Sequence, residues 1–181
     1  PDRMSREKGV TGRNSETYGN VTVFYEEGLL ETQQARPEDA KILELVEAGY
    51  DCRRGTEDSW PVLYHLSHLR ENLTEWLPIG PGDRVLEFGA DTGELTGGFL
   101  KKAGQVVCLE ESVSRSRILA KRHQSAENLS VYAGDPWRNL ELLKAESGGV
   151  YDWIVAVGLP GQAAEYFTGE HPEAEALKRL R

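Results

Sequence analysis

After Pro78, short apolar runs alternate with segments of helical length, and this alternation limits the fold more than any other feature of the chain. Helices of about ten residues are expected after each of the first three runs. Strands that alternate with helices predict βαβ units with right-handed crossovers. We therefore predict an α/β fold, with a mostly parallel sheet and helices on its faces. The expected strands are residues 84–88, 105–109, 129–133 and 151–157.

The first 78 residues have a different pattern. Residues 21–25 are β-branched and aromatic and predict a short strand, while the first ~20 residues are polar and glycine-bearing and are expected to be mobile. A helix is expected after Pro37. Apolar residues then recur at steps of three or four from Trp60 to Leu77 and predict one helix whose stripe lies mostly in the core. We predict two parts, a strand and helical cap segment at 1–78 and the α/β core at 79–181.

Composition limits the function classes. The chain has 181 residues, 21 basic and 30 acidic, and a net charge of −9. A protein that binds a nucleic-acid backbone usually has a basic face, so no nucleic-acid partner is expected and a small-molecule ligand fits better. No stretch approaches the ~18 apolar residues of a membrane span. Cys52 and Cys108 have no ligand spacing, and we expect reduced thiols, no metal site and a cytoplasmic location.

Ligands of parallel sheets bind at the carboxyl ends of the strands. The first of these ends is a turn that begins and ends with glycine, and glycines let backbone N–H groups approach a ligand. Glu110 ends the second strand, where a carboxylate can accept hydrogen bonds from both hydroxyls of a ribose. Asp135 ends the third strand, where it could reach an adenine amino group or cap the following helix, and both roles can hold.

The order of residues in the first turn argues against a pyrophosphate. Glu87 precedes Gly89 by two residues, and the turn has the form Gly-x-x-x-Gly. Glu87 and Asp91 would repel a pyrophosphate but would tolerate a cofactor that carries a sulfonium and an ammonium. A nicotinamide dinucleotide-binding domain is therefore the less favoured alternative.

Residues 80 to 160 resemble class I S-adenosylmethionine-dependent methyltransferases. The resemblance rests on Val-Leu-Glu-Phe-Gly-Ala-Asp-Thr-Gly, Val-Cys-Leu-Glu, Ala-Gly-Asp and Tyr-Asp-Trp-Ile-Val. It implies a Rossmann-like, mostly parallel seven-stranded sheet with S-adenosylmethionine across the tips of its first four parallel strands. It also implies that Gly89 to Gly93 hold the methionine part, Glu110 the ribose and Asp135 the adenine. The predicted cofactor-binding residues are Glu87, Gly89, Ala90, Asp91, Gly93, Glu110, Glu111, Gly134 and Asp135.

A narrower resemblance concerns the acceptor. Residues 60–67 and 70–73 resemble the helix before the core in bacterial methyltransferase domains found beside glycosyltransferases of cell-surface polysaccharide pathways. This resemblance implies a small-molecule or glycan-linked acceptor. Tyr64 and His65 are candidate acceptor-binding residues in a lid over the methyl-transfer cleft, with surface or packing roles as the alternative. The sequence identifies no catalytic base.

The chain departs from the family pattern in two ways. Asp91 stands where the family usually has the middle glycine, and its carboxylate could pair with the cofactor's ammonium or obstruct the methionine tail. Aspartate tolerates left-handed backbone geometry, so the turn can survive. The family also continues beyond the fourth strand, where residues 172–181 resemble the next helix. The core is therefore expected to be incomplete, either as a truncated domain or with a C-terminal domain or a partner chain completing the sheet.

Two further alternatives stay open. A degenerate pocket would make the chain a non-catalytic binding or assembly module. A methyltransferase acting on nucleic-acid bases is less favoured, because residues 158–161 lack the amide or acid and the aromatic residue that such enzymes carry there.

Overall fold

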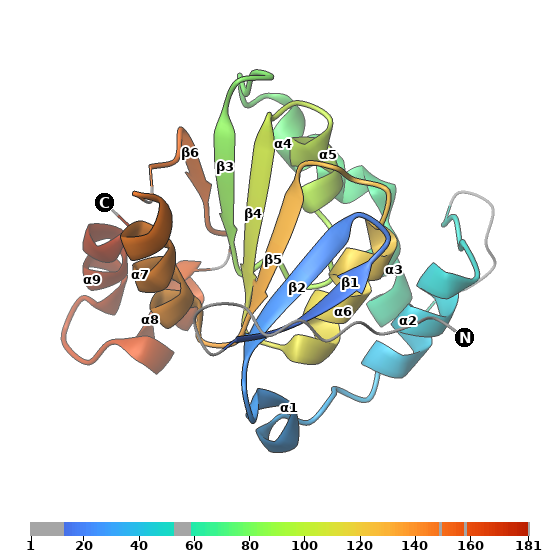
Figure 1. The fold of residues 1–181 in the computed structure, drawn as a ribbon, viewed down its shortest axis with the longest axis horizontal. Coiled ribbons are helices and arrows are strands. Elements are labelled where there is room, and N and C mark those ends of the chain that lie inside the picture. Colours follow the sequence, from blue (N-terminus) through green and yellow to red (C-terminus); the bar gives the residue numbers. More distant parts are fainter. Residues whose placement is uncertain (1–12, 53–58, 149, 158, 181) are drawn as a thin grey trace.

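The computed structural model describes residues 13–52, 59–148, 150–157 and 159–180. They form one six-stranded sheet in the order β1-β2-β5-β4-β3-β6 (Figure 1). The strands β3 to β6 are parallel to one another, so the predicted α/β fold with a mostly parallel sheet is confirmed. The strand bounds are Arg13–Tyr18 for β1, Val21–Glu26 for β2, Arg84–Phe88 for β3, Gln105–Glu110 for β4, Leu129–Ala133 for β5 and Trp153–Val155 for β6.

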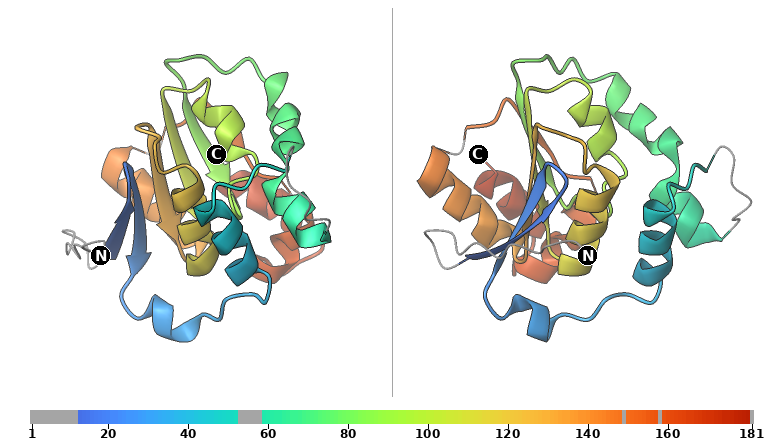
Figure 2. Two further views of the ribbon diagram at one scale, coloured as in Figure 1. Left: turned by 90° about the vertical axis from the view of Figure 1, so that its right-hand side faces the viewer. Right: turned by 45° about the vertical axis from the view of Figure 1, so that its right-hand side comes forward.

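The central strands are mostly apolar because helices cover both faces of the sheet. Val106 and Cys108 of β4 face one layer, whereas Val107 and Leu109 face the other. The helices α5 and α6 cover the first face, and α7, α8 and α9 cover the second (Figure 2). The helix bounds are Leu29–Thr32 for α1, Asp39–Glu47 for α2, Trp60–Leu66 for α3, His68–Glu71 for the 3-10 helix η1, Asn72–Glu75 for α4, Thr96–Leu100 for α5, Val113–Arg122 for α6, Pro136–Ser147 for α7, Leu159–Tyr166 for α8 and Pro172–Arg179 for α9.

The N-terminal strands extend the sheet. β1 and β2 form an antiparallel hairpin, and β2 pairs in parallel with β5, where Val23 lies opposite Val131. The sequence analysis did not predict β1, whose backbone groups pair with β2. The sheet thus joins strands from both sides of residue 78, and a domain boundary at that position stays a prediction.

The expected single helix between Trp60 and Leu77 is interrupted at Ser67 and is replaced by α3, η1 and α4. Ser67 is extended (φ −67°, ψ 122°), and its hydroxyl accepts a hydrogen bond from Leu69 N, which starts η1. The break leaves large apolar side chains outside the core, contrary to the expectation for this stripe: Trp60 is 73% and Trp76 is 76% exposed. A helical period reports which residues share a face, but not whether another element covers it.

Close packing of η1 and α4 on α5 explains the two glycines in that helix. A Cβ at Gly98 would lie 2.1 Å from Thr74 Oγ1, and one at Gly97 would lie 2.3 Å from Glu71 Oε1. Glu71 also forms an ion pair with Lys101. The glycines therefore let the N-terminal segment approach the helix that follows the glycine turn.

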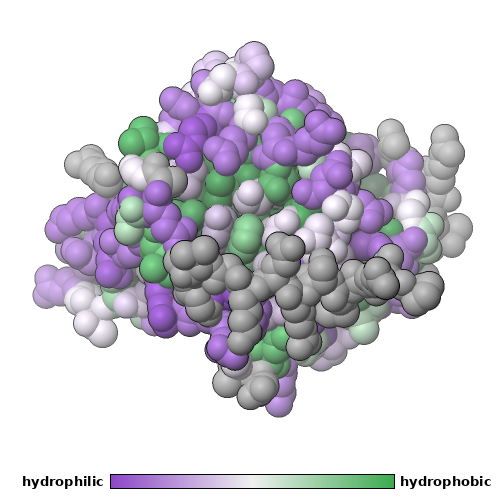
Figure 3. All heavy atoms as spheres, viewed as in Figure 1, coloured by the Kyte–Doolittle hydropathy of each residue, from purple (hydrophilic) through white to green (hydrophobic). Residues whose placement is uncertain are grey.

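The chain after β6 contains α8 and then α9, so the helix expected near residue 172 is not the first element after the fourth parallel strand. In the part of the chain that the structure describes, no helix has both the length and the apolar character needed to cross a membrane. Polar residues cover most of the face seen in Figure 3, with hydrophobic residues visible near its middle.

Candidate functional site

The turn after β3 adopts left-handed backbone conformations at three positions. The φ angles are 75° at Gly89, 50° at Asp91 and 83° at Gly93. The amides of Gly89 and Ala90 donate to the carbonyl oxygen of Leu109 at 2.8 and 3.1 Å. The end of β4 thus holds the turn in place, and glycine at both ends avoids the strain that a Cβ would bring.

Asp91 adopts the left-handed backbone conformation that the turn requires, although it is not a glycine. It is the one non-glycine residue with positive φ among the described residues. Its carboxylate forms an ion pair with Arg115 of α6, which also binds Asp39 Oδ1 at 3.2 Å and Glu38 Oε1 at 3.0 Å. Burial opposes the charge of Arg115, but Asp91 and Asp39 raise its pKa above the usual value. A charged, buried guanidinium therefore fixes the Asp91 side chain.

Gly93 is crowded by α6. His123 Nε2 lies 3.0 Å from the Gly93 carbonyl oxygen, and because that oxygen can only accept, Nε2 carries the proton. Burial lowers the pKa of His123 to about 4, so the ring is neutral at pH 7. A Cβ at Gly93 would lie 3.0 Å from both this nitrogen and Leu119 Cγ.

Replacement of Gly93 by alanine is expected to lower the free energy of unfolding by about 2–4 kcal/mol, because the left-handed backbone and the crowding both oppose a methyl group. Urea denaturation measures this loss. Gly148→Ala is the matched control, since Gly148 has φ 73° and nothing within 4 Å of a Cβ; it should lose only ~1 kcal/mol. Equal losses in both variants would contradict the crowding.

Glu110 connects the turn to the next helix. Its carboxylate accepts hydrogen bonds from Asp91 N at 2.8 Å and from Ser112 N at 2.9 Å. A carboxylate has about four acceptor positions, so two remain for a ligand. Glu110 is 8% exposed. The strand tip therefore presents a preorganised acceptor beside the turn.

Glu87 lies beneath the turn and is 4% exposed. It accepts hydrogen bonds from Thr96 Oγ1 at 2.7 Å and from Cys108 Sγ at 3.4 Å. Burial raises the pKa of Glu87 and that of Glu110 to about 7 each. Both carboxyls are thus sensitive to a positive charge bound nearby, which would favour their ionised form.

The end of β5 is held by backbone and capping bonds. Gly134 N donates to the carbonyl oxygen of Glu110 at 2.9 Å. Asp135 Oδ1 accepts from Trp137 N at 2.9 Å and from Arg138 N at 3.2 Å, so the capping role foreseen for this aspartate is confirmed. Its role toward an adenine stays a prediction.

Two cavities share the glycine turn. One, of about 80 Å³, lies over the tips of β3 and β4, and the other, of about 170 Å³, lies toward η1. Gly89 and Asp91 line both, so a ligand bound in one could extend past the turn into the other. The first is lined by Arg36, Phe88, Gly89, Asp91, Glu110, Glu111, Arg115, Pro136 and Tyr166, and the second by Tyr64, Arg70, Glu87, Gly89, Ala90, Asp91, Glu94, Leu95 and Val157.

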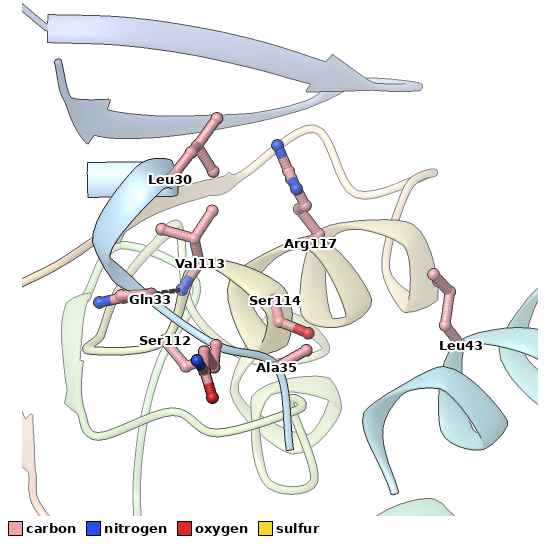
Figure 4. Close-up of a pocket in the computed structure, with 9 residues that line it drawn as sticks. Leu30, Gln33, Ala35, Leu43, Ser112, Val113, Ser114 and Arg117 are labelled. Carbon is pink, nitrogen blue, oxygen red and sulfur yellow. Dashed lines mark hydrogen bonds between the residues drawn. The ribbon is translucent and has the colours of Figure 1, made fainter. Parts of the chain in front are cut away.

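Another cavity, of about 210 Å³, lies between the chain after α1 and the start of α6 (Figure 4). There Gln33 accepts a hydrogen bond from Val113 N at 2.8 Å and donates one to the Glu111 carbonyl oxygen at 2.8 Å. This cavity contains neither the glycine turn nor a carboxylate, so the two cavities at the turn are the better candidates for the site predicted from the sequence.

Tyr64 and His65 occupy different environments. Tyr64 lines the larger cavity at the turn and is 37% exposed, whereas His65 is 6% exposed. His65 Nδ1 is hydrogen-bonded to Glu94 Oε1 and lies 3.8 Å from Asp91 Oδ1. These three residues place one potential metal-ligand atom each within 4.8 Å of one another, an arrangement that the sequence analysis did not foresee.

The sequence analysis also missed Arg115, Glu94 and Arg70. Arg115 is 1% exposed, although its helix also carries other basic residues that are more exposed. Its partners Asp91 and Asp39 precede it by 24 and 76 residues, so no local pattern marks them. The signal available was the excess of acidic residues around the turn, which requires a nearby cation once buried.

The affinity of this site for a cationic cofactor is expected to rise with pH. Ligand hydroxyls and cations favour ionised Glu87 and Glu110, whose pKa values are about 7, so protonation below pH 7 competes with binding. Binding should be about 10-fold weaker at pH 6 than at pH 8, with proton release near pH 7. Calorimetry in two buffers of different ionisation enthalpy measures both quantities. Equal affinities without proton release would contradict this expectation.

The stability of the free protein should change with pH in the direction opposite to that of the binding affinity. The folded-state pKa of each carboxyl lies above the usual glutamate value of 4.5, so the folded protein binds more protons between about pH 4.5 and 7. These two groups therefore make the free protein less stable as the pH rises through that window.

The order of the parallel strands and the turn after β3 give the chain a Rossmann-like fold. No family model matches the chain. The chain is similar to the probable ribosomal RNA small subunit methyltransferase A of Methanosarcina mazei, with 37% identity over 86 residues, 48% of this chain and 31% of that protein. The corresponding protein of Methanosarcina barkeri is 33% identical over 86 residues, 48% of this chain and 29% of that protein. The chain spans about a third of the length of these curated relatives.

Among solved structures, the chain is similar to an O-methyltransferase from Bacillus cereus in complex with SAH, with 18% identity, a TM-score of 0.48, and 83% of this chain and 64% of that chain covered. It is also similar to an amino pentose methyltransferase from Micromonospora echinaspora, with 15% identity, a TM-score of 0.40, and 83% of this chain and 46% of that chain covered. The names of the curated relatives confirm the predicted resemblance to methyltransferases.

Proposed function

We propose that this chain binds S-adenosylmethionine and takes part in methyl transfer. The observation that carries the proposal is the glycine turn pinned between Glu87 and Glu110, with cavities on both sides that share Gly89 and Asp91. The negative charge of the site suits a cofactor with a sulfonium and an ammonium and disfavours a pyrophosphate. The methyltransferase names of the curated relatives support the same proposal.

The polar groups of the site match the chemical parts of this cofactor. Glu110 has two free acceptor positions for the ribose hydroxyls, and Glu111 lines the same cavity. Tyr166 Oη donates to Glu111 Oε2 at 3.1 Å and borders the space where an adenine would lie. The turn from Gly89 to Gly93 would hold the methionine part, and Gly134 and Asp135 would border the adenine.

When bound, S-adenosylmethionine would supply a methyl group activated by its sulfonium centre. The chain's own contribution is to bind and orient. Glu110 and the turn are held by backbone hydrogen bonds before any ligand arrives, so little ordering is needed on binding. Positioning of donor and acceptor carries much of the rate in such a transfer, and no general base is assigned.

We favour a small-molecule or glycan-linked acceptor, with Tyr64 and His65 as the proposed acceptor-side residues. The net charge of −9 supports this choice over a nucleic acid. The name of the curated relatives, ribosomal RNA methyltransferases, favours RNA as the second candidate. We also propose a bacterial source and a cytoplasmic location. We further propose that a C-terminal domain or a partner chain completes the sheet.

The experiment that tests the proposal is calorimetric titration of the purified chain with S-adenosylhomocysteine, with NAD as the control ligand. Micromolar binding of the first, ~8 kcal/mol, without binding of NAD would support the cofactor. Tighter binding of NAD, or binding of neither ligand by folded protein, would contradict it.

A non-catalytic binding module is the main alternative, and Asp91 favours it. If the aspartate obstructs the methionine tail, Asp91→Gly should raise the affinity for S-adenosylhomocysteine strongly. If the pocket has its functional form, the same variant should bind no more tightly, because Asp91 already pairs with Arg115. Titration of both proteins distinguishes these outcomes.

A further inference from the structure

Arg70 stands out among the residues of the larger cavity at the turn. It comes from η1 and lines this cavity together with three acidic residues, Glu87, Asp91 and Glu94. Its guanidinium lies over the ring of Tyr64, with the central carbon 4.1 Å from the ring centroid. Its Nε is buried and, within the described part of the chain, has no hydrogen-bond partner.

Several other arginines of the described chain pair with carboxylates. Arg115 binds Asp39 and Asp91, and Arg117 binds Glu16 at 2.6 Å. No carboxylate of the described residues lies within ion-pair distance of Arg70, although three carboxylates line the same cavity. A buried donor without a partner destabilises the protein, and a bound acceptor would remove this cost. Arg70 is therefore available to bind an anionic group that the described residues do not supply.

The charges of the cavity match an α-amino acid. Such a group presents a carboxylate and an ammonium about one carbon apart. A guanidinium binds a carboxylate through two parallel hydrogen bonds, and carboxylates bind an ammonium. The arginine and the acidic residues of the cavity thus offer a group of the right charge to each end of a zwitterion.

We propose that Arg70, positioned by Tyr64, binds the α-carboxylate of the cofactor's amino acid part. This inference rests on the proposed function and deepens it. Because Gly89 and Asp91 line both cavities, a ligand whose ribose lies at Glu110 has its opposite end in the cavity that contains Arg70. Arg70 would thereby link the N-terminal segment to cofactor binding.

The test compares two ligands that differ in this amino acid part. S-adenosylhomocysteine has the carboxylate and the ammonium, and 5′-methylthioadenosine lacks both. Arg70→Gln is expected to weaken S-adenosylhomocysteine binding about 10- to 100-fold and to change 5′-methylthioadenosine binding less than about 2-fold. Arg70→Lys should lie between the wild type and Arg70→Gln, because a lysine keeps the charge without the planar fork. Calorimetry measures each affinity, and circular dichroism confirms the fold.

Arg84→Gln is the matched control. Arg84 also lies over a tyrosine ring, that of Tyr151 at 5.1 Å, but it lies at the amino end of β3, away from the turn. This variant should bind both ligands like the wild type.

The outcomes separate this inference from the proposed function. Normal binding of S-adenosylhomocysteine by Arg70→Gln would overturn the inference and leave the cofactor intact. An equal loss for both ligands would also overturn it, since Arg70 would then support the site without contacting the amino acid part. Binding of neither ligand by the wild type would overturn the proposed cofactor, and the role of Arg70 with it.

Discussion

Replacement of Glu110 by glutamine is expected to weaken S-adenosylhomocysteine binding at least ~100-fold, or ~3 kcal/mol. The carboxylate has two positions left for ribose hydroxyls after it accepts from Asp91 N and Ser112 N. A glutamine amide has one oxygen in place of two, so it loses acceptors both for the ligand and for one backbone N–H. The charge-assisted bonds it replaces are about twice as strong as neutral ones.

Isothermal titration at pH 8, where Glu110 is ionised, measures this loss. The matched control is Glu127→Gln, an exposed carboxylate on the loop after α6, which should bind the ligand like the wild type. A change below ~3-fold for Glu110→Gln would remove Glu110 from the cofactor site.

Replacement of Arg115 by methionine is expected to lower the free energy of unfolding by about 3–5 kcal/mol. Arg115 is 1% exposed and joins α2, α6 and the glycine turn through Asp39 and Asp91. Its removal leaves the carboxylate of Asp39, which is 1% exposed, without its charge partner. A loss of this size is a large part of the stability of a typical domain.

Urea denaturation of single and double variants tests the cause. Arg115→Met/Asp39→Asn should recover at least ~1 kcal/mol relative to Arg115→Met, because the asparagine removes the buried charge and can still accept from Arg36 N. Arg138→Met is the exposed control, since Arg138 is 65% exposed in its pair with Glu26 and should change stability by less than ~1 kcal/mol. Stability within 1 kcal/mol of the wild type for Arg115→Met would show that the buried network contributes little.

Much of the sheet could be predicted because its strands are local patterns. The bounds of β3 and β5 agree with the expected residues 84–88 and 129–133, since each apolar run is bounded by turn residues. The expected left-handed geometry of Asp91 is also present, because aspartate is among the few residues that tolerate it. The roles of these residues toward a cofactor stay predictions.

The N-terminal segment was predicted less well, because its structure depends on contacts that a period does not encode. The stripe from Trp60 to Leu77 has a helical period, but Ser67 ends α3 and the following residues turn to pack on α5. The pairing of β2 with β5 joins residues more than one hundred positions apart. Local pattern indicates an element and its face, while the partner that covers the face is a tertiary property.

The sequence by itself determined the βαβ order and the glycine turn with an acidic residue on each neighbouring strand, because backbone geometry and hydrophobic period act over a few residues. Only the tertiary structure decided which basic side chains lie near the acidic residues of the site. It brings Arg115 to Asp91, His65 to Glu94 and Arg70 to the open cavity, across separations of 24 residues or more for the first two pairs. The physical reason is that a buried charge needs a partner in space, and the chain can supply that partner from any element that the fold brings close.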